Sequence, residues 1–163
     1  MTLTTAQLQF LDEATAEAIR ADQIFPEMAA CEAALESRYG QSELACEGNN
    51  LFGMKQHEHP QYQTLNLPTH EGTPGHSDWR EITAEFVHYP DWATCFGDRL
   101  ATLRRLSAEY PHYAAALAAS DPETYVSEVS KTWSSDTMRA THVSQIYQDY
   151  MTLKETGGVN AHN

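Results

Sequence analysis

Residues 33–55, AALESRYGQSELACEGNNLFGMK, are the most informative stretch of this chain. The stretch begins with the apolar pattern of a helix, and Gly40 is well placed to end that helix. Ser42 can cap the start of a short further helix. The run from Asn49-Asn50 to Leu51-Phe52-Gly53 is typical of a turn that places an aromatic ring in the core. Amide side chains that satisfy an ordinary loop would account for the same run.

Glu36 is the candidate catalytic residue of this stretch. Ala33, Ala34 and Leu35 precede it, so its carboxyl group is expected near the apolar face of the helix. An ionised carboxylate is costly in such a place, and a carboxyl group that keeps its proton near neutral pH can act as a general acid. A glutamate that pairs with Arg38 or with a backbone N–H would explain the residue without any catalysis.

Helices are predicted on the N-terminal side of this stretch as well. Apolar residues recur there at steps of three and four, which indicates one buried helix face. The members of this stripe are Leu8, Leu11, Ala14 and Ala18. Pro26 is suited to the first turn of a second helix, so the chain from Thr5 to about Glu47 is expected to be helical.

The character of the chain changes over residues 56–89, which are rich in proline and histidine. Gln63–Pro68 and Glu81–Tyr89 have the pattern of strands, and a flexible loop over Glu71–Ser77 is expected between them. The sequence therefore predicts a small β-hairpin lobe. An isolated hairpin is marginal in water, so this lobe should lean on the helical body.

Helices return from Asp91 onward. Asp121-Pro122 is a strong helix start, and Asp136 can cap the last helix. The expected architecture is mainly α, a single domain over residues 1–155 with the hairpin lobe at about 56–89. Residues 156–163 are expected to be a disordered tail. A groove between lobe and bundle is a common place for an extended substrate.

Composition excludes several classes of function. The 163 residues contain 10 Lys plus Arg and 23 Asp plus Glu, which gives a formal charge of −13. Because affinity for phosphates comes from clustered Lys and Arg, no nucleic-acid partner is expected. No apolar run reaches the ~18 residues of a membrane span, and the N-terminus has neither the basic nor the apolar region of a conventional signal peptide.

Neither a metal nor a cofactor is expected. Eight histidines occur, among them His57, His59, His70 and His76. No cysteine lies near these four and no HExxH pair is present, so exposed loop histidines explain them better than a zinc site. The three cysteines have no metal-type spacing. Buried thiols are the preferred interpretation, and one disulfide with a free thiol left over is the alternative.

Three stretches resemble one known family. ALESRYGQSELACEGNNLFGMK closely resembles the glucosaminidase domains of glycoside hydrolase family 73, which include flagellar muralytic proteins, autolysins and phage lysins. EFVHYPDWATCFGDRLATL is similar to the family's strand and following helix with a buried aspartate, here Asp98. YVSEVSKTWSSDTMRATHVSQIYQDY is similar to its closing segment and last helix. The resemblance covers about residues 5–153.

The resemblance implies a lysozyme-like fold and an activity. The enzyme would cleave the β-1,4 bond between N-acetylglucosamine and N-acetylmuramic acid in peptidoglycan, with Glu36 as the acid and Glu71 as the second carboxylate. Direct inversion and assistance by the substrate's N-acetyl group both stay open as mechanisms. The residues expected to bind substrate are Tyr39, Asn50, Trp133 and Asp136.

The sequence departs from the family at three places. Trp133 replaces the tyrosine of the closing motif, Arg38-Tyr39 replaces a small residue and tryptophan, and Val87 replaces the usual strand arginine. An indole can stack on a sugar ring but has no phenol hydroxyl. These changes concern contacts beyond Glu36.

The biological setting follows from the same resemblance. We expect the protein to act in the periplasm or cell wall, exported without a classical signal peptide, as a delivered antibacterial effector with an immunity protein that plugs the groove. A phage-type lysin is the alternative, which the acidic charge fits poorly. A non-catalytic glycan-binding module on the same fold is a second alternative.

Overall fold

Helix α1 (Thr5–Arg20) opens the computed structural model, which describes residues 2–160. Thr4 caps this helix: its hydroxyl accepts the backbone N–H of Gln7, and the Gln7 side chain accepts the N–H of Thr4 in return. The predicted apolar stripe faces the core, and its buried members are Leu11, Ala14 and Ala18.

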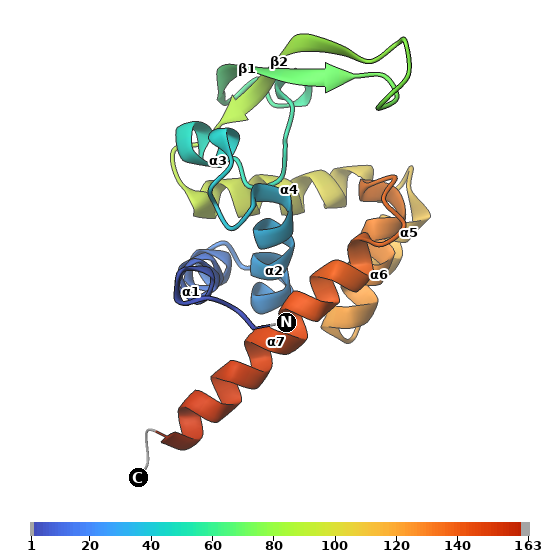
Figure 1. Ribbon diagram of the computed structural model, residues 1–163. Coiled ribbons are helices and arrows are strands. Elements are labelled where there is room, and N and C mark those ends of the chain that lie inside the picture. The colour runs from blue at the N-terminus through green and yellow to red at the C-terminus, as the bar shows by residue number, and fades with distance from the viewer. Residues whose placement is uncertain (1, 161–163) are drawn as a thin grey trace.

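Helix α2 (Pro26–Ser37) runs through the middle of the helical body, with α1 on one side and α7 (Arg139–Asn160) on the other (Figure 1). Pro26 stands at its start, as predicted. Its small buried residues allow neighbouring helices to approach closely, and they are Ala29, Ala30, Ala33 and Ala34. This close packing fixes the direction of α2 and therefore the place of its C-terminal end.

The C-terminal end of α2 differs from the expected glycine cap. The helix is capped by Arg38 and not by Gly40. Arg38, Tyr39 and Gly40 have φ angles of 52°, 54° and 77°, all in the left-handed region. This conformation costs a residue with a side chain on the order of 1–2 kcal/mol. A Cβ on Gly40 would lie 2.9 Å from the ring of Phe10, so this turn packs against α1 only with glycine.

The predicted short helix and turn after α2 are confirmed. Helix α3 (Glu43–Gly48) begins after Ser42, whose hydroxyl accepts the backbone N–H of Ala45. The following turn buries Leu51 and Phe52. A single 3-10 turn, η1 (Gln56–Glu58), then leads into the lobe.

The β-hairpin lobe is confirmed, with a first strand that is longer than expected and a second strand that is shifted by one residue. Strands β1 (Gln63–Glu71) and β2 (Arg80–His88) pair antiparallel in a register that places Leu67 opposite Ala84 and Glu71 opposite Arg80. One face of the hairpin buries Leu67, Ala84 and Phe86 against Leu44 of α3. The hairpin lies across the end of the molecule that is remote from the C-terminus (Figure 1).

Helix α4 (Trp92–Leu106) passes between the hairpin and the other helices (Figure 1). Helix α5 (Pro111–Leu117) follows, and α6 (Pro122–Trp133) begins at the predicted cap, because Asp121 Oδ1 accepts the N–H of Thr124. Helix α7 continues to Asn160, so the tail expected from residue 156 is helical as far as that residue. Residues 161–163 lie outside the described part. Within residues 2–160, no helix has the length and apolar character that crossing a membrane requires.

Candidate active site

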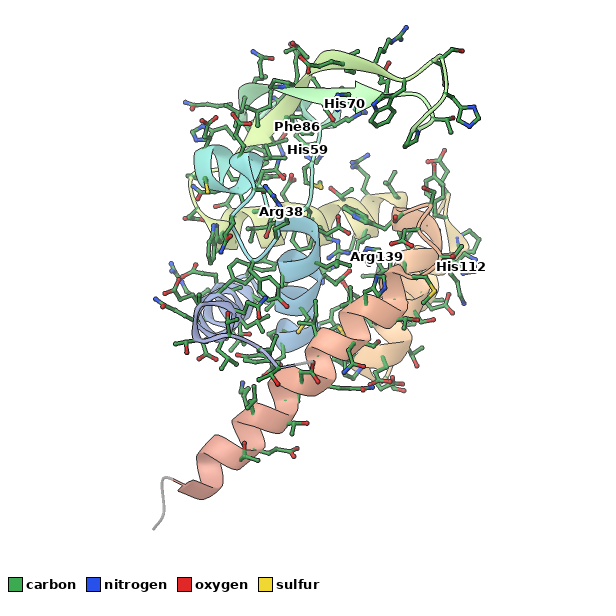
Figure 2. All side chains as sticks on the ribbon, viewed as in Figure 1. Arg38, His59, His70, Phe86, His112 and Arg139 are labelled. Atoms are coloured by element: carbon green, nitrogen blue, oxygen red, sulfur yellow. The ribbon has the colours of Figure 1, made fainter. Side chains whose placement is uncertain are left out.

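Glu36 lies in the last turn of α2 and is held by an arginine from α7. Its Oε1 accepts a hydrogen bond from Nε of Arg139 at 2.7 Å, and 26% of the Glu36 side chain is exposed. Arg38, two residues further on, and Arg139 both lie at the ends of their helices that face the hairpin (Figure 2). The predicted apolar surroundings of Glu36 are wrong, because a guanidinium group contacts its carboxylate. The alternative pairing with Arg38 is replaced by a partner 103 residues away.

Arg139 belongs to a buried network of charged side chains. Its Nη2 donates to Glu32 Oε2 at 2.9 Å, and its Nη1 donates to Ser130 Oγ at 2.8 Å. Arg99 of α4 donates to both oxygens of Glu32, at 3.0 and 2.7 Å. The side chains of Glu32 and Arg99 are fully buried and that of Arg139 is 1% exposed. With Glu36 included, two guanidinium groups balance two carboxylates.

The network keeps Glu32 ionised. Burial, the largest single cause, acts to raise the pKa of this carboxyl group. The charges and hydrogen bonds of Arg99 and Arg139 together outweigh burial and hold the pKa of Glu32 below its usual range. A buried carboxylate with two arginine partners is therefore a fixed negative charge one helical turn from Glu36.

Two aromatic rings enclose the guanidinium group of Arg99. The Cζ atom of Arg99 lies 4.6 Å from the ring centroid of Phe52 and 4.6 Å from that of Trp133. The two rings also meet edge to face, with centroids 6.4 Å apart. Trp133 is therefore a wall of the buried network as well as a partly exposed aromatic residue.

Glu32, Arg99 and Arg139 were not predicted from the sequence, where each resembles an ordinary surface charge. One signal was available for Glu32: it precedes Glu36 by four residues, so both carboxylates project from the same face of α2. The helix is otherwise apolar on that side, which makes an unpaired glutamate improbable there. The partners themselves lie 67 and 107 residues away, beyond the reach of local patterns.

Asn50 has a structural position. It is 1% exposed; its Nδ2 donates to the carbonyl oxygens of Met54 and Val87, and its Oδ1 accepts the N–H of Met54. The amide thus ties the turn after α3 to strand β2. The loop-satisfying interpretation of the asparagines accounts for these three hydrogen bonds.

Asp136 lies in the turn before α7, three residues ahead of the first helical residue, and also borders a cavity. Its Oδ1 accepts the N–H of Met138 at 2.9 Å. The cavity of about 480 Å³ lies between the end of α6 and the start of α7. Hydroxyl groups dominate its lining, from Ser127, Ser130, Ser134, Ser135 and Thr137. Because Ser130 accepts a hydrogen bond from Arg139, this cavity lies on the other side of the guanidinium group that holds Glu36.

Tyr39 borders a different cavity. Leu35 and Tyr39 form one wall of a space of about 280 Å³, and His142 and Ile146 of α7 form the opposite wall. The Tyr39 ring also packs edge to face on Phe10, with centroids 6.0 Å apart. The four residues predicted to bind substrate are therefore not brought together in one place.

Glu71 ends strand β1 and is exposed. Its Oε2 accepts a hydrogen bond from Arg80 across the hairpin at 3.0 Å, and both side chains are largely in solvent, at 48% and 70% exposure. Side chains alternate along a strand, so Glu71 shares a face with Thr69 and Leu67, the face that packs toward α3.

His59 corrects the expectation that the lobe histidines are exposed. It is 4% exposed, and its Nδ1 lies 2.8 Å from Asp98 Oδ2. The hydroxyl of Tyr89 donates to the same oxygen, and burial above all raises the pKa of Tyr89, so this hydroxyl keeps its proton. Asp98 thus joins the chain before β1 and the chain after β2 to α4. Among the described residues, no three His, Cys, Asp or Glu side chains gather into a group that could hold a metal ion.

The cysteines follow the preferred interpretation in part. Cys31 and Cys95 are buried free thiols, whereas Cys46 is exposed and also free. Burial raises the pKa of the Cys95 thiol to about 12, which makes it unreactive near neutral pH.

Comparison with known proteins gives a family and a fold. A model of the glucosaminidase family, described as mannosyl-glycoprotein endo-beta-N-acetylglucosaminidase, matches residues 12–152. The catalytic domain of the autolysin Auto from Listeria monocytogenes is 23% identical with a TM-score of 0.76, over 92% of this chain and 87% of that one. No curated protein matches the sequence.

Two further solved structures have the same architecture. The glycoside hydrolase domain of FlgJ from Salmonella typhimurium is 20% identical with a TM-score of 0.73, over 95% of this chain and 94% of that one. A mutant of the peptidoglycan hydrolase from Sphingomonas sp. A1 is 19% identical with a TM-score of 0.67, over 86% and 92%. These likenesses confirm the expected lysozyme-like bundle with its hairpin lobe.

Proposed function

Because this chain belongs to the glucosaminidase family of glycoside hydrolases, we propose that it cleaves the β-1,4 bond between N-acetylglucosamine and N-acetylmuramic acid in peptidoglycan. The observation that carries this proposal is the place of Glu36. Its carboxylate is fixed at the end of α2 that faces the hairpin, inside the matched region. The hydrolase from Sphingomonas, which shares the fold, supports peptidoglycan as the substrate.

Glu36 is the general acid of the proposed reaction. It delivers a proton to the glycosidic oxygen, so that the departing sugar leaves as a neutral alcohol. Positive charge then develops at the anomeric carbon of the other sugar. A second group must steady that charge or activate the water that attacks it.

Glu71 is the proposed second carboxylate. It lies at the end of β1 in the hairpin lobe, bound to Arg80 and otherwise in solvent, and closure of the lobe would bring it toward the substrate. In this case it activates water and the reaction inverts. Where the N-acetyl group of the substrate itself attacks, Glu71 has no role as a base.

Trp133 and Asp136 are proposed to contact the glycan next to Glu36. The exposed part of the indole offers a face to a sugar ring, and Asp136 borders the hydroxyl-lined cavity between α6 and α7. Tyr39 borders the separate space between α2 and α7, where a more distant part of the strand would lie.

The proposed setting is that of an antibacterial effector delivered to the periplasm, with an immunity protein that covers the groove. The charge of −13 supports this over a lysin that must find an anionic wall from solution, because like charges repel. Expression of the chain with and without a periplasmic export signal tests the setting. Toxicity only after export is expected, whereas lysis of cells by added protein would favour the lysin.

The activity is tested by release of new reducing ends from purified peptidoglycan. We expect Glu36→Gln to keep the fold and to fall to background, because an amide of similar shape cannot donate the proton. Glu109→Gln, an exposed glutamate in the turn after α4, is the matched control and should equal the parent. Activity of Glu36→Gln within about tenfold of the parent would contradict the assignment, since general acid catalysis contributes more. Glycan binding by the parent without new reducing ends would indicate a binding module.

A further inference from the structure

We propose that Arg139 is the positioning residue of Glu36 and that it fixes the direction in which this carboxyl group faces the substrate. The inference rests on the proposed function, in which Glu36 is the general acid. Arg139 makes no contact with the substrate in this account. It acts through the carboxylate that it holds.

The hydrogen bonds of Arg139 hold its guanidinium group in one orientation. Its Nη1, Nη2 and Nε donate to Ser130, Glu32 and Glu36 at 2.8, 2.9 and 2.7 Å. A guanidinium group is planar, so fixing two of its nitrogens fixes the direction of the third. The side chain is 1% exposed and has no room to turn. Nε–H is therefore aimed at Oε1 of Glu36, and Oε2 is the oxygen left to carry the proton.

Glu32, which binds Arg139, is itself held by a second arginine. Glu32, which holds Nη2, is held by both terminal nitrogens of Arg99. The rings of Phe52 and Trp133 enclose Arg99 from two sides. This chain of contacts links α4, α2 and α7 to one carboxylate. Trp133 thereby contributes to the position of Glu36 through two arginines.

The test compares variants of Arg139, with reducing ends released from purified peptidoglycan as the readout. We expect Arg139→Gln to lower kcat by at least about tenfold, because the carboxylate loses its fixed direction. The apparent KM should stay within about twofold of the parent.

Arg139→Lys separates position from charge. The lysine keeps the positive charge but loses the planar fork, so kcat should fall while the apparent KM stays in place. Ser130→Ala removes one anchor without changing any charge, and we expect a fall in kcat of about threefold with an unchanged apparent KM. Arg104→Gln, an exposed arginine near the end of α4, is the matched control and should match the parent in kcat and KM.

The apparent KM does not depend on how much protein is folded, so a destabilised Arg139→Gln remains informative. If it yields no soluble protein, Arg139→Lys and Ser130→Ala carry the test. Parent-like kcat in both, or a loss of kcat/KM in Arg139→Gln that comes from KM alone, would overturn the inference while Glu36→Gln stays inactive. An active Glu36→Gln would instead overturn the proposed function.

Discussion

Glu36 and Glu71, the two carboxylates proposed for catalysis, stand on two differently built parts of the molecule. Glu36 ends a helix packed between two others and is held by a guanidinium group that is 1% exposed. Glu71 ends a strand whose hairpin is attached to α3 by a small apolar cluster of Leu67, Ala84 and Phe86. Its partner Arg80 is 70% exposed. Both glutamates are paired with arginine, but only in the first pair is the arginine buried.

The difference indicates a division of roles. Regions with few buried contacts open at lower free-energy cost than the core does, and moving parts of active sites come from such regions. The helical body can therefore hold the acid in a fixed direction, while the hairpin can bring a second group to a bound substrate. The five predictions that follow test this contrast.

Removing Glu32 should have the largest effect on stability. Glu32→Ala leaves Arg99 and Arg139 buried without a fully matching negative charge, and breaking a buried ion pair costs about 3–5 kcal/mol. We expect a loss of that size in the free energy of unfolding, measured by urea denaturation. Glu85→Ala, on the exposed face of β2, is the control and should change it by less than about 0.5 kcal/mol. A loss below about 1 kcal/mol for Glu32→Ala would mean that the network does not hold the body together.

Acid should destabilise the helical body as well, because it removes the negative charge of Glu32. The pKa of Glu32 is below its usual range in the folded protein, because Arg99 and Arg139 outweigh its burial. Its contribution to stability is therefore complete above the unfolded-state value of about 4.3 and is lost as pH falls through the lower folded-state value. We expect the unfolding free energy from this group to be flat between about pH 5 and 7 and to fall below about pH 4. Glu32→Gln should lose that part of the acid dependence, and an unchanged slope would contradict the assignment.

Glu71→Gln should reduce turnover and leave stability alone. A general base contributes about 100-fold or more, and the exposed side chain contributes little to the fold. We expect kcat to fall by about two orders of magnitude with the melting temperature and apparent KM unchanged. If kcat is unaffected while Glu36→Gln is inactive, the N-acetyl group of the substrate takes the second role and Glu71 is not the base.

Much of the fold follows from the sequence, because local rules determine it. The stripe of Leu8, Leu11, Ala14 and Ala18, the Ser42 cap and the Asp121-Pro122 start each depend on neighbours within a few residues. The structure reproduces all of them. The predictions were wrong or incomplete where the end of an element depends on more distant residues. Strand β1 continues through Glu71, and helix α7 runs to Asn160.

The candidate site was only partly predictable for the same physical reason. Glu36 stands in a recognisable motif, but Arg99 and Arg139 acquire meaning only when folding brings them to Glu32. A charged residue in a sequence is normally at the surface, and nothing local distinguishes a buried one. His59 is a second case, since its burial depends on Asp98.

Trp133 packs against the buried network of the helical body, so its replacement should lower the stability of the protein. Trp133→Ala removes one of the two rings that enclose Arg99, and we expect a stability loss of about 2 kcal/mol, smaller than for a fully buried ring. Trp133→Tyr keeps a ring over the guanidinium group and should lose less than about 1 kcal/mol. Glycan affinity measured on the same variants separates the two roles. Weaker binding at unchanged stability would make Trp133 a sugar platform alone.

Breaking the exposed ion pair of the hairpin should have the smallest effect. Arg80 and Glu71 lie 3.0 Å apart, scarcely further than the 2.7 Å between Arg139 and Glu36, so distance alone would predict similar strength. The exposure of the Arg80–Glu71 pair makes it weaker, because water screens its charges and two mobile side chains must be ordered to form it. Such a pair contributes only about 0–1 kcal/mol to the free energy of unfolding. We expect Arg80→Gln to change the unfolding free energy by less than about 0.5 kcal/mol at low salt and to lose even that difference at 1 M salt. A loss above about 2 kcal/mol would show that the outer pair anchors the hairpin, and the division between a fixed acid and a movable second carboxylate would then fail.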